Sequence, residues 1–263
     1  MAKSKIDWCD DTWNPVTGCR HGCPYCYARS MTNRFGDKGT GELHELAEPV
    51  KSKGKKLVYP FGFDPTFYEY KLGDYAGPKK EGRTIFVCSM ADLFGDWVPD
   101  EWITRVFRAC RQAPQHTYLF LTKNPKRYGK LNDEGILPAD QNMFFGCTVT
   151  DQESFDRCTD AMKKGLHFIN NSFLSIEPLR GRIEMTTPRA IRLQCFEWII
   201  IGAETGNHPD KVIPEREWIE EIVEARHNKF SHLPLFMKDN LSQVWGDNLI
   251  REYTGMARRT HHT

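Results

Sequence analysis

Short apolar runs recur along the chain and show little alternation between apolar and polar positions. They are rich in β-branched and aromatic residues and occupy positions 84–90, 117–121, 142–149, 167–176, 197–201 and 233–237. Strands with this pattern are buried on both faces, as in a parallel sheet. Together with a short strand near 12–16, the runs predict about seven strands.

The segments between these runs have the periodicity of amphipathic helices. Apolar residues at 103, 106, 107 and 110 form one stripe. Residues 150–153 read Thr-Asp-Gln-Glu and predict a capping box for a helix that ends at Gly165, and a third helix is predicted over about 214–228. This order of strands and helices predicts an α/β fold, an open or partial (β/α) barrel with mainly parallel strands.

Composition and charge narrow the class of protein. A chain of 263 residues with 40% hydrophobic content can bury one large core, so we expect a single domain over 1–263. The formal net charge of +1 gives the molecule no overall attraction to nucleic acid or acidic membranes, and any such preference must come from a local patch. No apolar stretch approaches a membrane span or a signal core. We therefore expect a cytoplasmic protein without a membrane partner.

The connection at about 36–82 fits the barrel pattern least. It carries four lysines between positions 51 and 56, then seven aromatic residues between 59 and 75, then basic residues at 79, 80 and 83. Basic residues interleaved with aromatic ones are typical of single-stranded nucleic acid binding. The alternative is a small apolar core under a long loop, with the lysines in solvent. Because long loops are usually functional or ordered by their own packing, we expect a lid or substrate-facing insertion.

Polar residues follow every predicted strand. In parallel βα barrels the active site lies at the C-terminal ends of the strands, so these side chains should converge. They are Ser89 and Asp92; Thr122, Lys123 and Asn124; Thr148 and Thr150; Glu177; Glu204 and Thr205; and Lys238, Asp239 and Asn240. An ordinary loop or cap role is the alternative for each. Lys123 and Lys238 are substrate-side candidates, because a lysine can neutralise a carboxylate or phosphate, although a lysine at a strand end can also simply reach solvent.

Three cysteines form the most demanding pattern in the chain. Cys19, Cys23 and Cys26 have the spacing C-x-x-x-C-x-x-C, and Tyr25 precedes the last of them. Nine cysteines without a secretory signal indicate a reducing compartment, where this spacing is typical of metal binding rather than of disulfides. Iron–sulfur clusters are normally held by four cysteines, so a cubane held by three leaves one iron open to another ligand.

The spacing resembles the signature of the radical S-adenosylmethionine (SAM) superfamily. The surrounding residues are similar to a narrower phage-borne and bacterial family of unassigned reaction, and they are Trp13-Asn14-Pro15, Gly22-Cys23, Cys26-Tyr27-Ala28 and Ser89-Met90-Ala91-Asp92-Leu93-Phe94. The resemblance covers most of the chain. It implies that the three cysteines bind a [4Fe-4S] cluster and that its open iron chelates SAM.

In that superfamily, reductive cleavage of SAM gives methionine and a 5′-deoxyadenosyl radical, which abstracts hydrogen from a substrate. The resemblance therefore implies a radical SAM enzyme that takes an electron from an external low-potential donor. It does not identify the substrate, for which a nucleotide or nucleic acid is one candidate class.

The resemblance also implies contacts to SAM, and the expected residues are Tyr25, Ser89, Asp92, Thr148, Thr150, Glu177 and Glu204. The segment after the second strand contacts the SAM amino group in the family, although this chain lacks the common Gly-Gly-Glu there. Fourth-strand residues reach the ribose hydroxyls, which implies Thr148 or Thr150. The two glutamates would lie near the methionine or adenine portions, and Tyr25 would pack near adenine.

A closed zinc site is the alternative for the cysteines. It would require His21, Cys9 or a distant residue as the fourth ligand, since structural zinc sites are tetrahedral. The usual zinc pattern has two separated ligand pairs, and this chain has no second pair of that kind. The second functional hypothesis is therefore a non-catalytic iron–sulfur or zinc protein that uses the same barrel for binding or regulation.

Overall fold

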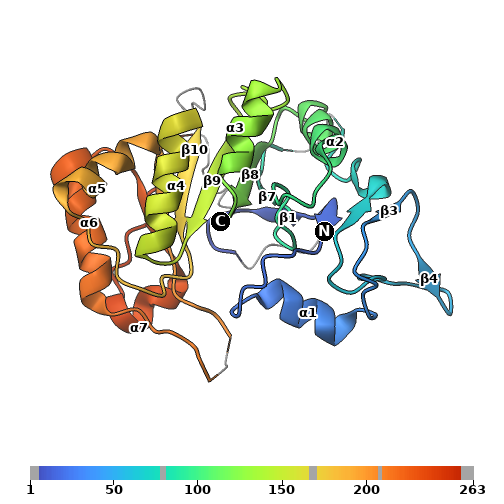
Figure 1. The fold of residues 1–263 in the computed structure, drawn as a ribbon, viewed down its shortest axis with the longest axis horizontal. Helices are drawn as coiled ribbons and strands as arrows, with labels where there is room; N and C mark the ends of the chain where they lie inside the picture. Colours follow the sequence, from blue (N-terminus) through green and yellow to red (C-terminus); the bar gives the residue numbers. More distant parts are fainter. Residues whose placement is uncertain (1–5, 78–80, 166–170, 207–208, 256–263) are drawn as a thin grey trace.

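Seven parallel strands form the main sheet of the computed structural model, which describes residues 6–77, 81–165, 171–206 and 209–255. In spatial order they are β1 (Asp11–Trp13), β7 (Thr84–Val87), β8 (Thr117–Thr122), β9 (Met143–Val149), β10 (Ser172–Ile176), β11 (Trp198–Ile201) and β12 (Leu235–Met237). This order is also their order along the chain, and the sheet curls into a half-barrel (Figure 1). The predicted α/β partial barrel is confirmed.

The strand bounds differ from the prediction where the backbone cannot continue the ladder. β7 ends at Val87 rather than at 90 because the chain turns at Cys88, which has a positive φ of 59°. β12 begins at Leu235 because the preceding Pro234 has no amide hydrogen to donate. Pro15 divides the predicted strand at 12–16 into β1 and β2 (Val16–Thr17). The predicted strand at 167–176 begins partly outside the described residues.

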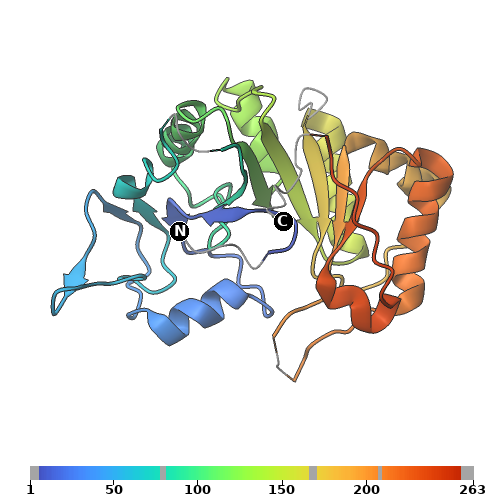
Figure 2. The same ribbon diagram turned by 180° about the vertical axis from the view of Figure 1, so that it is seen from behind.

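Helices cover the outer face of the sheet in a row (Figures 1 and 2). They are α2 (Asp100–Arg111), α3 (Lys126–Asp133), α4 (Gln152–Gly165), α5 (Thr187–Arg192) and α6 (Arg216–Phe230). The predicted apolar stripe of α2 is buried against the sheet. The capping box predicted at Thr150 is wrong by one residue. Asp151 caps α4 instead, because its Oδ1 accepts the Ser154 amide at 2.9 Å and its charged oxygen is the stronger acceptor.

The inner face of the half-barrel is filled near its base by large side chains. Inward positions of six strands form one cluster with the N-terminal segment, and the buried members are Trp8, Cys9, Phe86, Leu119, Phe144, Phe173, Trp198, Ile200 and Phe236. The carboxylate of Asp7 accepts hydrogen bonds from the Asp239 amide at 2.7 Å and from Arg251 at 3.1 Å, near the end of β12. The segment at 6–10 therefore crosses the inner face from the end of β12 to the start of β7, where the Asp10 amide donates to the Thr84 carbonyl at 2.9 Å.

The connection at 36–82 builds a smaller sheet on the β1 side of the molecule (Figure 1). Its strands β3 (His44–Leu46) and β6 (Thr66–Tyr68) pair with β2 in the order β2-β6-β3, and β4 (Lys51–Ser52) pairs with β5 (Lys55–Lys56) as a hairpin. Phe67, Tyr68 and Tyr75 are buried, whereas the lysines of the hairpin are exposed. The aromatic residues thus supply packing, and a role as lid or substrate-facing insertion stays a prediction.

The remaining helices are α1 (Tyr27–Phe35), α7 (Ser242–Trp245) and the short 3-10 helices η1 (Glu69–Lys71), η2 (Leu193–Cys195) and η3 (Asp239–Leu241). α1 and the loop after β11 lie at the same end of the sheet in both views (Figures 1 and 2). Among the described residues, none of the helices combines the length and the apolar character that a bilayer crossing requires.

Candidate functional site

The cysteine loop joins β2 to α1 and is fixed at both ends. At its start, the Gly18 amide donates to the Met90 carbonyl at 2.9 Å, which ties the loop to the segment after β7. Gly18 has a φ of 87°, and a Cβ there would lie 2.2 Å from the Asp64 carbonyl oxygen, so only glycine lets the insertion pass this close. At its end, Cys26 caps α1, and its Sγ accepts the Arg29 amide at 3.4 Å.

A cavity of about 600 Å³ lies at the C-terminal ends of the strands, next to the cysteine loop. All three cysteines of the motif line it, and so do ten of the predicted residues: Tyr25, Ser89, Asp92, Thr122, Lys123, Thr148, Glu177, Glu204, Thr205 and Lys238. Thr150 does not line it; its hydroxyl lies 3.1 Å from an Asp151 carboxylate oxygen and also neighbours the Tyr25 phenol. The side chains after the strands thus converge, while their roles remain predictions.

The three thiols provide a donor set for a metal cluster, although they are not drawn together as ligands. In the part of the chain that the structure describes, no three His, Cys, Asp or Glu side chains are gathered closely enough to hold a metal ion. Burial, with Asp92 and the other two cysteines nearby, raises the pKa of Cys19 to about 12. A thiol must lose its proton to become a metal ligand. Because burial disfavours the thiolate, a positively charged group is needed to stabilise it.

Asp92 is buried at the edge of this cavity and its oxygens are fully occupied. Oδ2 accepts from His21 Nε2 at 2.7 Å and from the Lys123 amide at 2.9 Å, and Oδ1 accepts from the Thr122 hydroxyl and the Phe94 amide. Although burial alone would raise it, these hydrogen bonds hold the pKa of Asp92 below its ordinary value. Asp92 therefore orients His21, whose ring also packs edge-on against Trp97.

Glu177 and Lys238 form an ion pair at the ends of β10 and β12. Burial would lower the pKa of Lys238, but the Glu177 carboxylate outweighs it and raises that pKa. Gly202 makes room for the pair, since a Cβ there would lie 2.8 Å from Lys238 Cδ and 3.2 Å from Glu177 Cδ. The sequence did not predict this ion pair. It predicted Glu177 as a contact to SAM and Lys238 as a contact to the substrate.

Arg180 connects two of the predicted cofactor contacts. Its Nε lies 2.9 Å from Glu204 Oε2, and its guanidinium lies 5.2 Å from the centre of the Tyr25 ring. Lys123 Nζ lies 5.7 Å from the same ring. Burial and the neighbouring Cys23 raise the pKa of Tyr25, which therefore keeps its proton. The tyrosine face is thus approached by two cations, and Arg180 was missed because it follows the strand end by several residues.

Hydroxyl groups line the cavity at inward positions that the sequence did not single out. Ser175 pairs in register with Thr148 on the neighbouring strand, and Thr12 occupies an inward position of β1. Ser175 is fully buried, and its hydroxyl has no hydrogen-bond partner among the described residues. The sequence pattern could have identified Ser175, because side chains of a strand alternate between its two faces. Ser175 lies two residues after Phe173 and therefore shares its inward face.

Two further residues fix the segment after β7. Asn14 accepts from the Ser89 hydroxyl at 3.2 Å and from the Met90 amide at 2.9 Å through the same oxygen. The Tyr27 hydroxyl donates to the Ser89 carbonyl. Both Asn14 and Tyr27 lie in the motif segments that flank the cysteines, so the motif was the signal that could have identified them.

Comparisons with known proteins yield a family and a fold. A family model described as "Protein of unknown function (DUF5131)" matches residues 3–254. A search of curated proteins gave no match. A cysteine-to-serine variant of spore photoproduct lyase has a similar structure, with a TM-score of 0.58 and 13% identity over 90% of this chain and 79% of that one.

Two liganded structures of spore photoproduct lyase are also similar. The complex with dinucleoside spore photoproduct has a TM-score of 0.54 and 12% identity, over 85% of this chain and 75% of that one. A double variant with bound AdoMet (SAM) and dinucleoside spore photoproduct has a TM-score of 0.54 and 11% identity, over 86% of this chain and 75% of that one. At these identities the likeness shows the fold, a half-barrel like that of radical SAM proteins.

Proposed function

The chain belongs to the DUF5131 family, and we propose that it is a radical SAM enzyme whose [4Fe-4S] cluster is bound by Cys19, Cys23 and Cys26. One observation carries the proposal: the three thiols of a single loop share a cavity with the polar side chains that follow the parallel strands. The fold of spore photoproduct lyase, one structure of which contains AdoMet, supports the same cofactor here.

The donor set fits such a cluster. Three thiolates from the protein leave one iron for SAM, and among the described residues no fourth cysteine lines the cavity. Cys19, Cys23 and Cys26 would hold the cluster, which when bound would supply the one-electron chemistry for reductive cleavage of SAM. An external low-potential donor would provide that electron.

The chain's own residues would bind and orient SAM. The hydroxyls of Thr148 and Ser175 suit the ribose, and Thr148 is favoured over Thr150 because only Thr148 lines the cavity. The Glu177 carboxylate suits the SAM ammonium group, with Lys238 balancing its charge. Tyr25, backed by Arg180, offers a face on which adenine can pack.

A nucleotide or nucleic acid is the substrate class that we propose. Tyr27 and Met31 of α1 line the cavity and remain 47% and 41% exposed. Tyr59 and Phe63 of the insertion line it as well. Aromatic side chains that remain accessible, here Tyr27 and the half-buried Tyr59 and Phe63, can stack on nucleobases. Two of the similar lyase structures contain a dinucleoside.

The zinc alternative has less support. His21 is held by Asp92, and Cys9 is buried in the aromatic cluster at the base of the half-barrel.

Anaerobic reconstitution with iron and sulfide tests the proposal. We expect a brown protein that forms 5′-deoxyadenosine from SAM when dithionite is added, and a Cys23→Ala variant that loses both the iron and the product. Cys195→Ala, which alters a cysteine outside the cavity, and Cys9→Ala should keep both. A colourless protein that binds zinc, loses it on Cys9→Ala or His21→Ala and does not bind SAM would overturn the proposal.

A further inference from the structure

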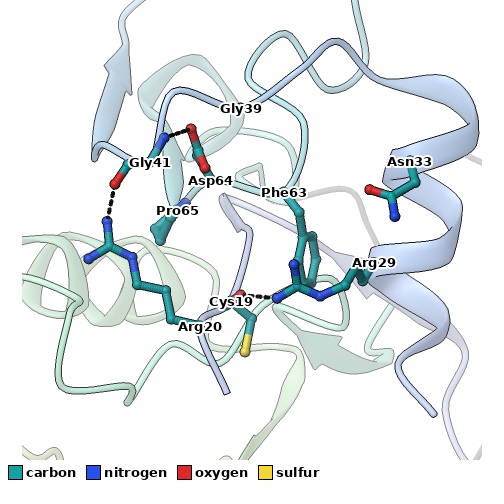
Figure 3. A pocket seen from close by; sticks show the side chains of 9 residues that line it. All are labelled: Cys19, Arg20, Arg29, Asn33, Gly39, Gly41, Phe63, Asp64 and Pro65. Carbon is teal, nitrogen blue, oxygen red and sulfur yellow. Dashed lines mark hydrogen bonds between the residues drawn. The ribbon is translucent and has the colours of Figure 1, made fainter. Parts of the chain in front are cut away.

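A second cavity, of about 400 Å³, adjoins the first and shares Cys19 and Phe63 with it. Three parts of the chain build it: the cysteine loop, α1 and the insertion (Figure 3). Arg20 comes from the loop, Arg29 and Asn33 come from α1, and the remaining walls are residues 39, 41 and 63–65. The proposed cofactor site does not account for this cavity.

Two guanidinium groups give this cavity its charge. Arg20 donates to the Gly41 carbonyl at 2.7 Å, and Arg29 donates to the Cys19 carbonyl at 3.1 Å, each through Nη2 (Figure 3). Neither guanidinium has a carboxylate partner in the part of the chain that the structure describes. Since an arginine has five N–H donors, each side chain is oriented by the backbone and keeps further donors for a ligand.

Asp64 is the one carboxylate among the described residues that line this cavity, and it is occupied by its own surroundings. Its Oδ2 accepts the Gly41 amide at 2.8 Å and the Thr40 amide, and it lies 3.5 Å from His44 Nε2. Asp64 therefore shapes the loop at 39–41 and leaves both arginines unpaired. The walls carry an excess of positive charge.

We infer that this second cavity binds a phosphate group of the substrate. Guanidinium groups match phosphate oxygens in geometry as well as in charge, and two of them lining one cavity favour a dianion or phosphodiester. Phe63 belongs to both cavities, and the Arg29 guanidinium lies 4.7 Å from the centre of its ring. A nucleotide could therefore place its base toward the aromatic rim of the first cavity and its phosphate between the arginines.

The inference rests on the proposed function only in placing the substrate beside the cysteine loop. Its test uses the full chain without SAM and without a reductant, so that binding is measured separately from SAM cleavage. The probes are a fluorescently labelled single-stranded oligothymidylate of about eight nucleotides, a size within the site sizes of single-strand binders, thymidine 5′-monophosphate and inorganic phosphate.

The variant Arg20→Gln removes one guanidinium at an exposed position whose one side-chain hydrogen bond goes to a backbone carbonyl. We expect it to weaken oligonucleotide binding about tenfold, the value of one charge-assisted hydrogen bond. We also expect it to reduce the slope of log K against log salt by about 0.7. The matched control is Arg34→Gln on α1, the helix that also carries Arg29. Arg34 is exposed, lies over Phe35 and lines neither cavity, so this variant should bind like the native chain.

Arg29→Lys provides a second variant, because it keeps the charge but not the planar donor set. We expect weaker binding with an unchanged iron content after reconstitution, which shows that the cysteine loop is intact. Competition by the monophosphate alone would identify a nucleotide substrate, and binding of the oligonucleotide alone would identify a strand. Either outcome supports the phosphate site.

Two results would overturn the inference. One is binding that Arg20→Gln and Arg34→Gln weaken equally, which would indicate general attraction to a cationic surface. The other is the absence of binding by all three probes at millimolar concentration. If the native chain binds the oligonucleotide but does not cleave SAM, the phosphate site stands and the proposed enzyme activity is overturned. If it cleaves SAM but binds none of the probes, only the phosphate site is overturned.

Discussion

The base and the mouth of the half-barrel are built on the same strands and have opposite character. At the base, inward residues such as Phe144, Phe173 and Trp198 are buried in one aromatic cluster. Farther along the same strands, the inward residues Thr148 and Ser175 bring hydroxyl groups to the wall of the cavity. Inward residues near the start of each strand thus pack in the core, whereas inward residues near its C-terminal end line the cavity. One sheet therefore supplies both stability and a site.

The comparison predicts that changes at the base mainly lower stability, whereas changes at the mouth mainly affect binding. The largest loss of stability should follow Phe144→Ala, because it deletes a fully buried ring and leaves a cavity among other aromatic side chains. We expect the free energy of unfolding to fall by about 3–5 kcal/mol in urea titrations. Phe144→Leu should cost less than half of this. A folded Phe144→Ala protein that has lost SAM affinity would break the comparison.

Glu177→Gln tests a group at the mouth that also belongs to an ion pair. It leaves the Lys238 ammonium in a pocket where its side chain is 13% exposed, without the carboxylate that balances it. We expect a loss of about 2 kcal/mol in unfolding free energy, below the range for fully buried pairs because water reaches both side chains. The double variant with Lys238→Met should recover part of the loss. If the two single changes are simply additive, the pair does not contribute as a unit.

Asp92→Asn should lower stability in a way that depends on pH. Since the folded pKa of Asp92 lies below the ordinary 3.8, the charged form stabilises the fold above that pH, and this contribution disappears as pH falls through 3.8 toward the folded pKa. We expect the difference between native and variant proteins to be about 1–2 kcal/mol at neutral pH. It should shrink below pH 4 in urea titrations. A difference between native and Asp92→Asn proteins that stays constant with pH would contradict the hydrogen bonds to this carboxylate.

The smallest effect on stability is expected at the mouth. Ser175→Ala removes a hydroxyl that has no partner in the described chain, so unfolding free energy should change by less than about 0.5 kcal/mol. SAM affinity, measured by equilibrium dialysis of the reconstituted protein, should fall about fivefold, the value of one hydrogen bond. Ser172→Ala is the matched control on the same strand, because its hydroxyl bonds to the Cys195 carbonyl away from the cavity. Equal affinities for native and Ser175→Ala proteins would exclude this hydroxyl from the SAM site.

The sequence was sufficient for the half-barrel because its strands are buried on both faces and alternate with amphipathic helices. All seven strands of the main sheet were predicted, and parallel pairing then placed their C-terminal ends at one cavity. The convergence of side chains there could be predicted from the parallel direction of the strands alone, because all their C-terminal ends then lie at one edge of the sheet. Local choices between neighbouring residues were less certain, as the cap at Asp151 shows.

Features that depend on distant contacts could not be predicted from local patterns. The small sheet places β2 beside β6, and the close approach of Asp64 to Gly18 requires that pairing. The second cavity combines Arg20 and Arg29 with residues 39–41 for the same reason. Ser175 was missed because its run is apolar overall, so only the two-residue alternation distinguished it from its neighbours.

The closure at Asp7 has a consequence for the order of assembly. Asp7 bonds to Asp239 and Arg251, so the floor under the cavity is completed by contacts between segments more than two hundred positions apart. Such contacts form late, because a long loop must close before they contribute. A nascent chain would therefore expose its cysteine loop above an unfinished floor until the last strand emerged. The cluster proposed for this loop would then find a finished site only after the last strand has joined the sheet.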